Sequence, residues 1–124
     1  MLSQEKFNDI VTFFFTFQMI NKVYHWNTTS FARHKATDGF NNKFLELIDR
    51  FIELFIGNYN MKPIVNSIYI DNMYLSDNGI VELFIFTKKF LGKLDRYIDS
   101  TDLINIRDEM LGKVNQALYL FNLK

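Results

Sequence analysis

Apolar residues recur at the 3.6-residue spacing of amphipathic helices in four segments of the chain. The spacing predicts helices at about residues 4–27, 31–56, 77–98 and 101–121. A serine or threonine, residue types favoured at helix N-caps, is available at the start of each segment: Ser3, Ser30 or a threonine just before it, Ser76, and Ser100 or Thr101. Gly57 is expected to end the second helix. The chain is therefore expected to be all-α.

The connections between these helices predict how they are arranged. Residues 57–75 show no sustained helical spacing and contain Pro63, the chain's single proline, whereas the other two connections are short. A short, a long and a short connection give two antiparallel hairpins joined by a crossover, as in the ferritin-like four-helix bundle. We expect a single ferritin-like domain over residues 1–124, because this length suits one hydrophobic core.

The second predicted helix carries two different faces. At about 100° per residue, one stripe is apolar and suits the bundle core: Phe40, Phe44, Leu47, Ile48, Phe51 and Phe55. A second arc combines potential metal ligands with apolar residues: His34, Asp38, Asp49 and Glu53 with Leu45, Ile52 and Ile56. This second face is expected to meet another chain.

The potential ligands lie too far apart for one chain to close a site. His34 and Glu53 are separated by about 28 Å of helix, whereas metal ligands lie ~2.0–2.2 Å from their ion. Each i, i+4 pair, His34/Asp38 and Asp49/Glu53, is therefore half a site. If two copies of the helix pack antiparallel across a two-fold axis, the His34/Asp38 pair of each copy meets the Asp49/Glu53 pair of the other. This symmetry gives two identical sites. His25 is positioned to complete the first half, and the ligand types suit iron, zinc or manganese.

Composition narrows the function classes. Lys plus Arg equals Asp plus Glu at 14 each, without basic tails, so DNA binding is not expected. There is no cysteine, which excludes thiolate sites and disulfides.

The apolar run at residues 10–20 is shorter than the ~20 residues of a membrane span and has no signal-peptide flanks, so we expect a cytoplasmic protein without a membrane segment. A hydrophobic content of 48% exceeds what one small core needs, which favours a homo-oligomer.

Several residues together resemble a known family. "HWN" ends the first helix, a histidine and an aspartate four apart open the second, and "DRFIE" comes later in the same helix; this pattern resembles the Dps miniferritins of the ferritin superfamily. The resemblance implies an iron ferroxidase centre between two-fold-related subunits, with His25, His34 and Asp38 from one chain and Asp49 and Glu53 from the other. It implies an electron-donating role for Trp26, whose alternative is a partly buried packing anchor. Ferritin-like proteins of large algal DNA viruses are a weaker resemblance, and would place the protein in the host cytoplasm or virion.

The resemblance implies a protein that oxidises Fe(II) and stores ferric iron, as a dimer at least and up to a shell of twelve. One departure from the family concerns the turn between the first two helices. Only eight residues separate His25 from His34, fewer than in the family. The distance of His25 from the other ligands therefore depends on the path of this shortened turn. The alternative is a structural oligomerisation protein whose site is inactive or holds zinc. A di-iron site inside one bundle is excluded, because no Glu-x-x-His occurs.

Overall fold

A computed structural model describes residues 2–123, which form four α-helices and two short 3-10 helices. The helices are α1 (Gln4–Asn27), α2 (Phe31–Tyr59), η1 (Asn72–Leu75), α3 (Asp77–Gly92), η2 (Leu94–Arg96) and α4 (Thr101–Phe121). Residues 2–123 contain no strand, so the predicted all-α class with four helices is confirmed. Among the helices of this range, none has the length and apolar character needed to cross a bilayer.

The predicted helix starts are confirmed. The hydroxyl groups of Ser3, Ser30 and Ser76 accept hydrogen bonds from the backbone N–H three residues ahead, at 3.0, 3.1 and 2.9 Å. Each bond satisfies one of the N–H groups that a helix leaves free at its first turn. Ser100 precedes α4 as predicted, but its side chain makes no capping bond.

Two predicted helix ends are wrong. Helix α2 continues through Gly57 and ends at Tyr59, where Asn60 adopts the left-handed conformation with φ 53° and closes the helix through its N–H to the Ile56 carbonyl. A glycine inside a helix costs only ~1 kcal/mol, and asparagine can supply the left-handed cap. Helix α3 ends at Gly92, and the tighter η2 comes next, which still keeps Leu94 buried.

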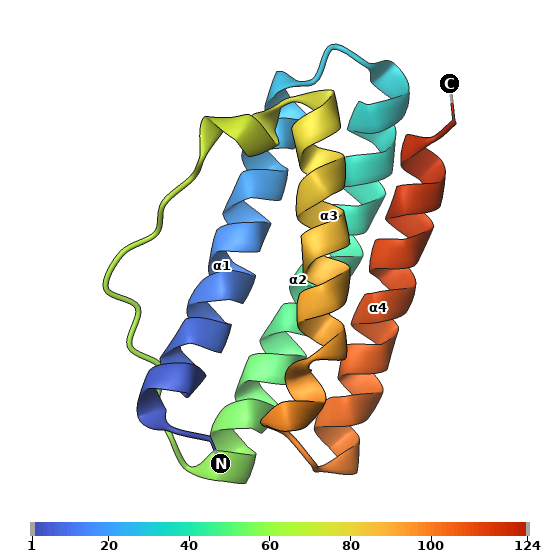
Figure 1. Ribbon diagram of the computed structural model, residues 1–124. Coiled ribbons are helices and arrows are strands. Elements are labelled where there is room, and N and C mark those ends of the chain that lie inside the picture. The colour runs from blue at the N-terminus through green and yellow to red at the C-terminus, as the bar shows by residue number, and fades with distance from the viewer. Residues whose placement is uncertain (1, 124) are drawn as a thin grey trace.

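The long connection runs along the bundle (Figure 1). It begins beside the start of α1, where the Ile64 N–H donates to Asn8 Oδ1 at 3.0 Å. It ends beside the other end of α1, where the Thr28 hydroxyl donates to Asp77 Oδ1 at 3.0 Å. Helices α2 and α3 therefore run in the same direction, and each forms an antiparallel hairpin with its neighbour in the chain, α1 and α4 respectively.

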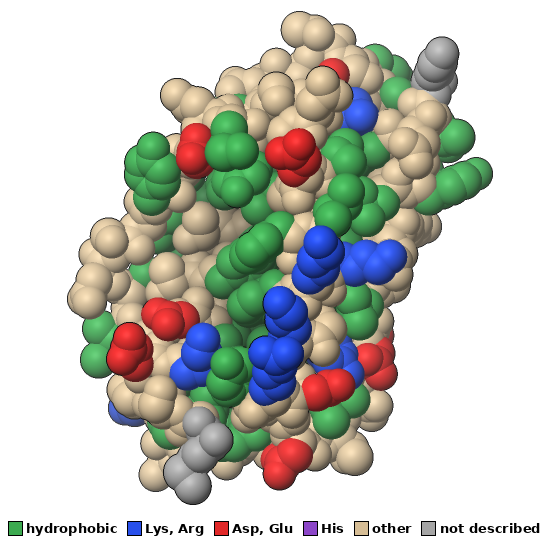
Figure 2. Space-filling model, in the orientation of Figure 1, with side chains coloured by type: hydrophobic (Ala, Val, Ile, Leu, Met, Phe, Trp, Pro, Cys, Tyr) green, Lys and Arg blue, Asp and Glu red, His purple; other side chains and the backbone are tan. Residues whose placement is uncertain are grey.

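Aromatic side chains fill the space between α1 and α3. The backbones of these two helices pack less closely than those of α1 with α2 or α3 with α4. The Phe13 ring stacks on Phe90 with centroids 4.1 Å apart and lies 5.8 Å from Phe86. Figure 2 shows the outer edge of this seam as a band of hydrophobic side chains. Bulky rings compensate for the wider helix separation, which explains part of the high phenylalanine content.

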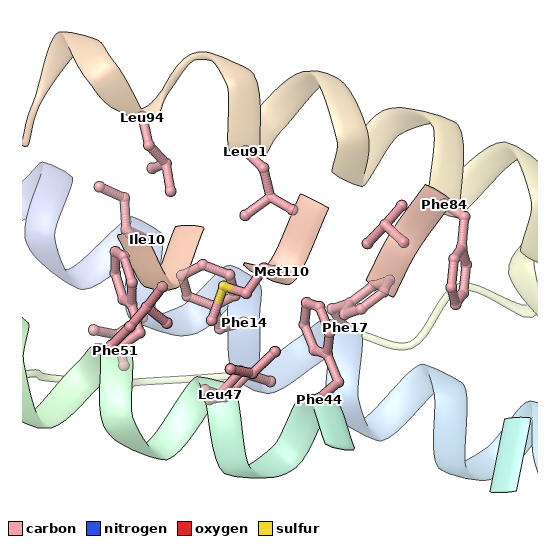
Figure 3. Packing of buried hydrophobic residues seen from close by; sticks show 14 of the residues in the cluster. Ile10, Phe14, Phe17, Phe44, Leu47, Phe51, Phe84, Leu91, Leu94 and Met110 are labelled. Atoms are coloured by element: carbon pink, nitrogen blue, oxygen red, sulfur yellow. The ribbon is translucent and has the colours of Figure 1, made fainter. Parts of the chain in front are cut away.

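All four helices contribute to one hydrophobic core (Figure 3). Phe14 and Phe17 of α1 face Phe44 and Phe51 of α2, and Met110 of α4 lies among them. The six residues predicted as the core stripe of α2 are all buried: Phe40, Phe44, Leu47, Ile48, Phe51 and Phe55. With its core stripe packed inside the bundle, α2 turns its second face outward.

Candidate metal centre

The turn between α1 and α2 brings the two histidines together. Helix α1 ends at Asn27 and α2 begins at Phe31, so only three residues separate them. The His25 and His34 rings stack with centroids 3.9 Å apart and planes inclined by 20°. The short turn therefore does not keep His25 away from His34.

Hydrogen bonds at Nδ1 favour one tautomer of each ring. His34 Nδ1 lies 3.1 Å from the His25 carbonyl oxygen, which only accepts, so this nitrogen donates. His25 Nδ1 lies 2.9 Å from the Thr37 hydroxyl, whose single proton is directed to the Arg33 and His34 carbonyls at 2.8 and 3.2 Å. His25 Nδ1 therefore also donates. This tautomer of each ring leaves Nε2 with its lone pair, and no described residue bonds to either Nε2.

A second network holds the helix ends that carry the histidines. Tyr24 is fully buried, and its hydroxyl donates to Asp77 Oδ1 at 2.5 Å. Arg33 donates to the Tyr24 hydroxyl at 3.1 Å and to the Phe121 carbonyl at 3.1 Å. Burial, and then the bond to Asp77, raise the pKa of Tyr24, so the phenol stays protonated as a donor. Because Tyr24 and Arg33 each precede a histidine, this network positions both rings.

The stacked geometry limits how the histidines can bind ions. A metal lies near the ring plane, ~2.0–2.1 Å from the coordinating nitrogen. The two ring centroids are 3.9 Å apart and the ring planes are inclined by only 20°, so the planes do not meet at that distance from the nitrogens. His25 and His34 therefore suit two neighbouring ions, one on each ring, rather than one shared ion.

Asp38 comes one turn after His34 on the same helix face and is exposed. Burial and the nearby His34 lower the pKa of His25, and Asp38 lies near enough to oppose them. Across residues 2–123, no three histidine, aspartate or glutamate side chains gather closely enough to hold an ion.

The other predicted half-site lies further along α2. Asp49 and Glu53 are exposed, and no described cation forms an ion pair with either. Asp49 borders a shallow groove of about 310 Å³ between α1 and α2, with Val11, Phe15, Gln18, Leu45, Ile48 and Ile52. Phe15 and Leu45 remain 39% and 42% exposed. The second face of α2 therefore combines free carboxylates with uncovered apolar surface, as its sequence pattern predicts.

Trp26 projects from the end of α1. Its side chain is 66% exposed, and Lys22 Nζ lies 5.8 Å from the ring centroid. In the single chain the ring is therefore mostly uncovered, and its alternative role as a packing anchor stays a prediction. Its proposed electron-donating role stays a prediction.

Stability of the metal-free protein is expected to fall with pH below about 6.5, the ordinary pKa of histidine. Burial and the neighbouring His34 and Lys22 lower the pKa of His25 in the folded state, while Asp38 opposes this. The unfolded chain then binds more protons in this window, so the neutral His25 contributes stability that is lost as pH falls through it. Urea unfolding in the presence of a chelator, between pH 7.5 and pH 5, measures the effect against His25→Gln. A variant with the same pH slope as the natural chain would contradict the prediction.

Sequence reasoning missed the residues that hold the histidines, namely Tyr24, Arg33, Thr37 and Asp77. A signal existed for Thr37, a hydroxyl three residues after His34 and on the same side of the helix. Asp77 gave no signal, because it meets Tyr24 only once the long connection has brought α3 beside α1.

Comparison with known proteins identifies a family but no described function. No curated protein and no solved structure matches the chain. One family model, described as a family of unknown function (DUF5856), matches residues 25–121, which include both histidines and the candidate carboxylates Asp38, Asp49 and Glu53 of α2. The chain therefore belongs to the family DUF5856.

Proposed function

We propose that the protein binds Fe(II) as its substrate between two copies of the chain and oxidises it. The observation that carries the proposal is the pair of histidines with uncommitted Nε2 atoms, His25 from the end of α1 and His34 from the start of α2, with free carboxylates further along the outward face of α2. Imidazole and carboxylate are ligands that iron accepts, and zinc or manganese would accept them as well. The run of α3 in the direction of α2 further supports a ferritin-like, Dps-like bundle.

An antiparallel pairing of α2 with its copy satisfies the geometry. The midpoint between His34 and Glu53 falls between positions 43 and 44 of the helix, and the midpoint between Asp38 and Asp49 falls at the same place. A two-fold axis at this point would bring His34 opposite Glu53 of the second copy and Asp38 opposite its Asp49. One axis thus aligns both ligand pairs, and it generates two identical sites.

The surface around this axis suits a subunit contact. Leu45 lies on the second face of α2, within two residues of the midpoint between His34 and Glu53, and is exposed. The apolar groove that Leu45 shares with Phe15 and Ile52 continues along it. Burial of such surface at ~25 cal/mol per Å² stabilises association, and it excludes water from the neighbouring ions. The proposed partner is therefore a second copy of this chain.

The stacked histidines support a reaction of two irons at once. With one ring for each ion, two Fe(II) ions would lie side by side and each would lose one electron. Those two electrons reduce one hydrogen peroxide, which takes up two protons and leaves as two waters. Carboxylates from both chains would offset the added positive charge of the ferric products. The exposed Trp26 is proposed as an additional electron donor beside this site.

Combined replacement Asp49→Asn and Glu53→Gln is expected to weaken Fe(II) binding by at least about a hundredfold, since even outer-shell partners of metal ligands contribute ~10–100-fold. Anaerobic equilibrium dialysis measures binding, and absorbance after peroxide addition measures oxidation. The matched control Glu46→Gln with Glu109→Gln removes two exposed carboxylates elsewhere on α2 and α4 and should bind as the natural chain does. Unchanged stoichiometric binding by the first variant, with native circular dichroism, would refute the site.

Leu45→Arg tests the second chain without touching a ligand. It should yield monomers by light scattering and lose Fe(II) binding, because each half-site then stands alone. Iron binding by a monomer would reject the intersubunit site.

The rival function is that of a structural protein in which the same face of α2 serves only to join chains. In that case the natural protein neither binds nor oxidises Fe(II), and Leu45→Arg only dissociates it. A shell of twelve chains with oxidation activity favours the miniferritin function instead.

A further inference from the structure

A second hollow lies at the opposite end of α1 from the histidines. It is a groove of about 230 Å³ between the start of α1 and the end of α3, lined by Lys6, Asp9, Ile10, Phe86, Lys89, Phe90, Lys93, Leu94, Arg96 and Tyr97. Lys6 and His25 are 19 residues apart on α1, or about 28 Å along the helix. The groove is therefore separate from the metal centre.

The groove concentrates positive charge in a chain with no net charge. Four of the 14 lysine and arginine residues line it, against the single carboxylate of Asp9. In the described chain, none of the four cations lies within 4.0 Å of a carboxylate oxygen. Figure 2 shows this grouping of Lys and Arg beside the lower part of the hydrophobic band. Unpaired cations around a hollow attract an anion.

The floor of the groove is apolar, and much of it is aromatic. Phe90 is held in place by stacking on Phe13, with centroids 4.1 Å apart. Phe86 is 55% exposed, so its ring is available to a ligand. Lys6 Nζ lies 5.0 Å from the Tyr97 ring centroid, which keeps one cation at the rim. Aromatic rings prefer to stack on other rings, beyond what burial of area alone contributes.

We propose that this groove binds a small aromatic anion, a flat ring system that carries a phosphate, sulfonate or carboxylate. The ring lies against Phe86 and Phe90, and the anionic group pairs with Lys89 and Lys93. A volume of about 230 Å³ is below the ~300–1,000 Å³ of drug-sized sites, so the groove suits one ring system rather than a dinucleotide. The four cations exclude an uncharged aromatic compound as the preferred ligand.

The test compares a charged with an uncharged probe on the full chain. Anilinonaphthalene sulfonate is an aromatic anion, and phenylnaphthylamine has the same rings without the sulfonate. Lys89→Glu with Lys93→Glu should weaken binding of the sulfonate about tenfold or more, measured by fluorescence titration, and change binding of the neutral probe by less than about twofold. Phe86→Ala should weaken both probes.

The matched control uses a second basic groove, between α2 and α4. Lys35→Glu with Lys113→Glu removes two cations from that groove and should leave sulfonate binding unchanged. Displacement of the probe by adenosine monophosphate would identify a nucleotide-like ligand, and displacement by indole acetate an aromatic carboxylate; either supports the proposal. The proposal would be overturned if neither compound displaced the probe, or if the control variant lost as much sulfonate binding. It would also be overturned if Lys89→Glu with Lys93→Glu bound the sulfonate as tightly as the natural chain. A lower molecular mass of that variant in light scattering would also overturn it, because the groove would then be a subunit contact.

Discussion

Replacement of Gly79 by alanine is expected to destabilise the protein by about 3 kcal/mol, the upper range for overpacking of a close contact. Gly79 lies in the first turn of α3, and a Cβ atom there would overlap the backbone carbonyl of Met73 in η1. The obstacle is backbone, so no side-chain rotation relieves it, and η1 or the start of α3 has to shift. Urea unfolding followed by circular dichroism measures the loss.

Gly112→Ala is the matched control for this prediction. Gly112 lies inside α4, and nothing stands within 4 Å of the position its Cβ would take. Alanine there should stabilise the protein by about 0.5–1 kcal/mol, because glycine is a poor helix former. Equal stability of the two variants would show that the Met73 backbone can shift without lowering the free energy of unfolding, and would contradict the close contact.

The position of Gly79 also links fold and site. The turn that Gly79 keeps compact contains Asp77, which accepts hydrogen bonds from both Tyr24 and Thr28. Tyr24 directly precedes His25, so a displaced α3 start would move the end of α1 and disturb the histidine stack. The arrangement of the two histidines thus depends on a helix that contributes none of the candidate ligands.

Much of the fold could be predicted from the sequence because the signals are local. Apolar spacing specifies which face of each helix is buried, and the core stripe of α2 is buried as its spacing predicts. Serine caps specify the helix starts. The ends were less predictable, since Gly57 and Gly92 look alike in sequence but only Gly92 ends a helix. The difference lies in the residues after each glycine: Asn60 closes α2 three residues beyond Gly57, whereas η2 returns Leu94 to the core directly after Gly92.

The candidate site could be predicted only in outline. Helix spacing placed His34, Asp38, Asp49 and Glu53 on one outward face, and the structure leaves all four exposed. The ring stack of His25 on His34 depends on the path of a three-residue turn, which periodicity does not encode. The hydrogen bond from His25 to Thr37 likewise crosses that turn, so no pattern within one helix reveals it.

Phe17 is the aromatic residue through which three helices meet. Its side chain is 1% exposed, and ring centroids of Phe44 and Phe84 lie 5.3 and 5.2 Å away, from α2 and α3. Phe40 and Phe13 lie 6.0 and 6.1 Å away. Removal of this ring would leave a space that its neighbours, themselves large and rigid, cannot fill by small rotations.

Phe17→Ala is therefore expected to lower the free energy of unfolding by about 3–5 kcal/mol, the range for buried phenylalanine, because lost burial and an unfilled cavity add together. Chemical denaturation with two probes, circular dichroism and Trp26 fluorescence, measures the change and checks that unfolding stays two-state. Phe31→Ala is the matched control: its ring is 74% exposed at the start of α2, and its loss should change stability by no more than ~0.5 kcal/mol. A loss below about 1.5 kcal/mol for Phe17→Ala would mean that the surrounding rings collapse into the space, and that the wide aromatic seam between α1 and α3 is more deformable than its stacked geometry indicates.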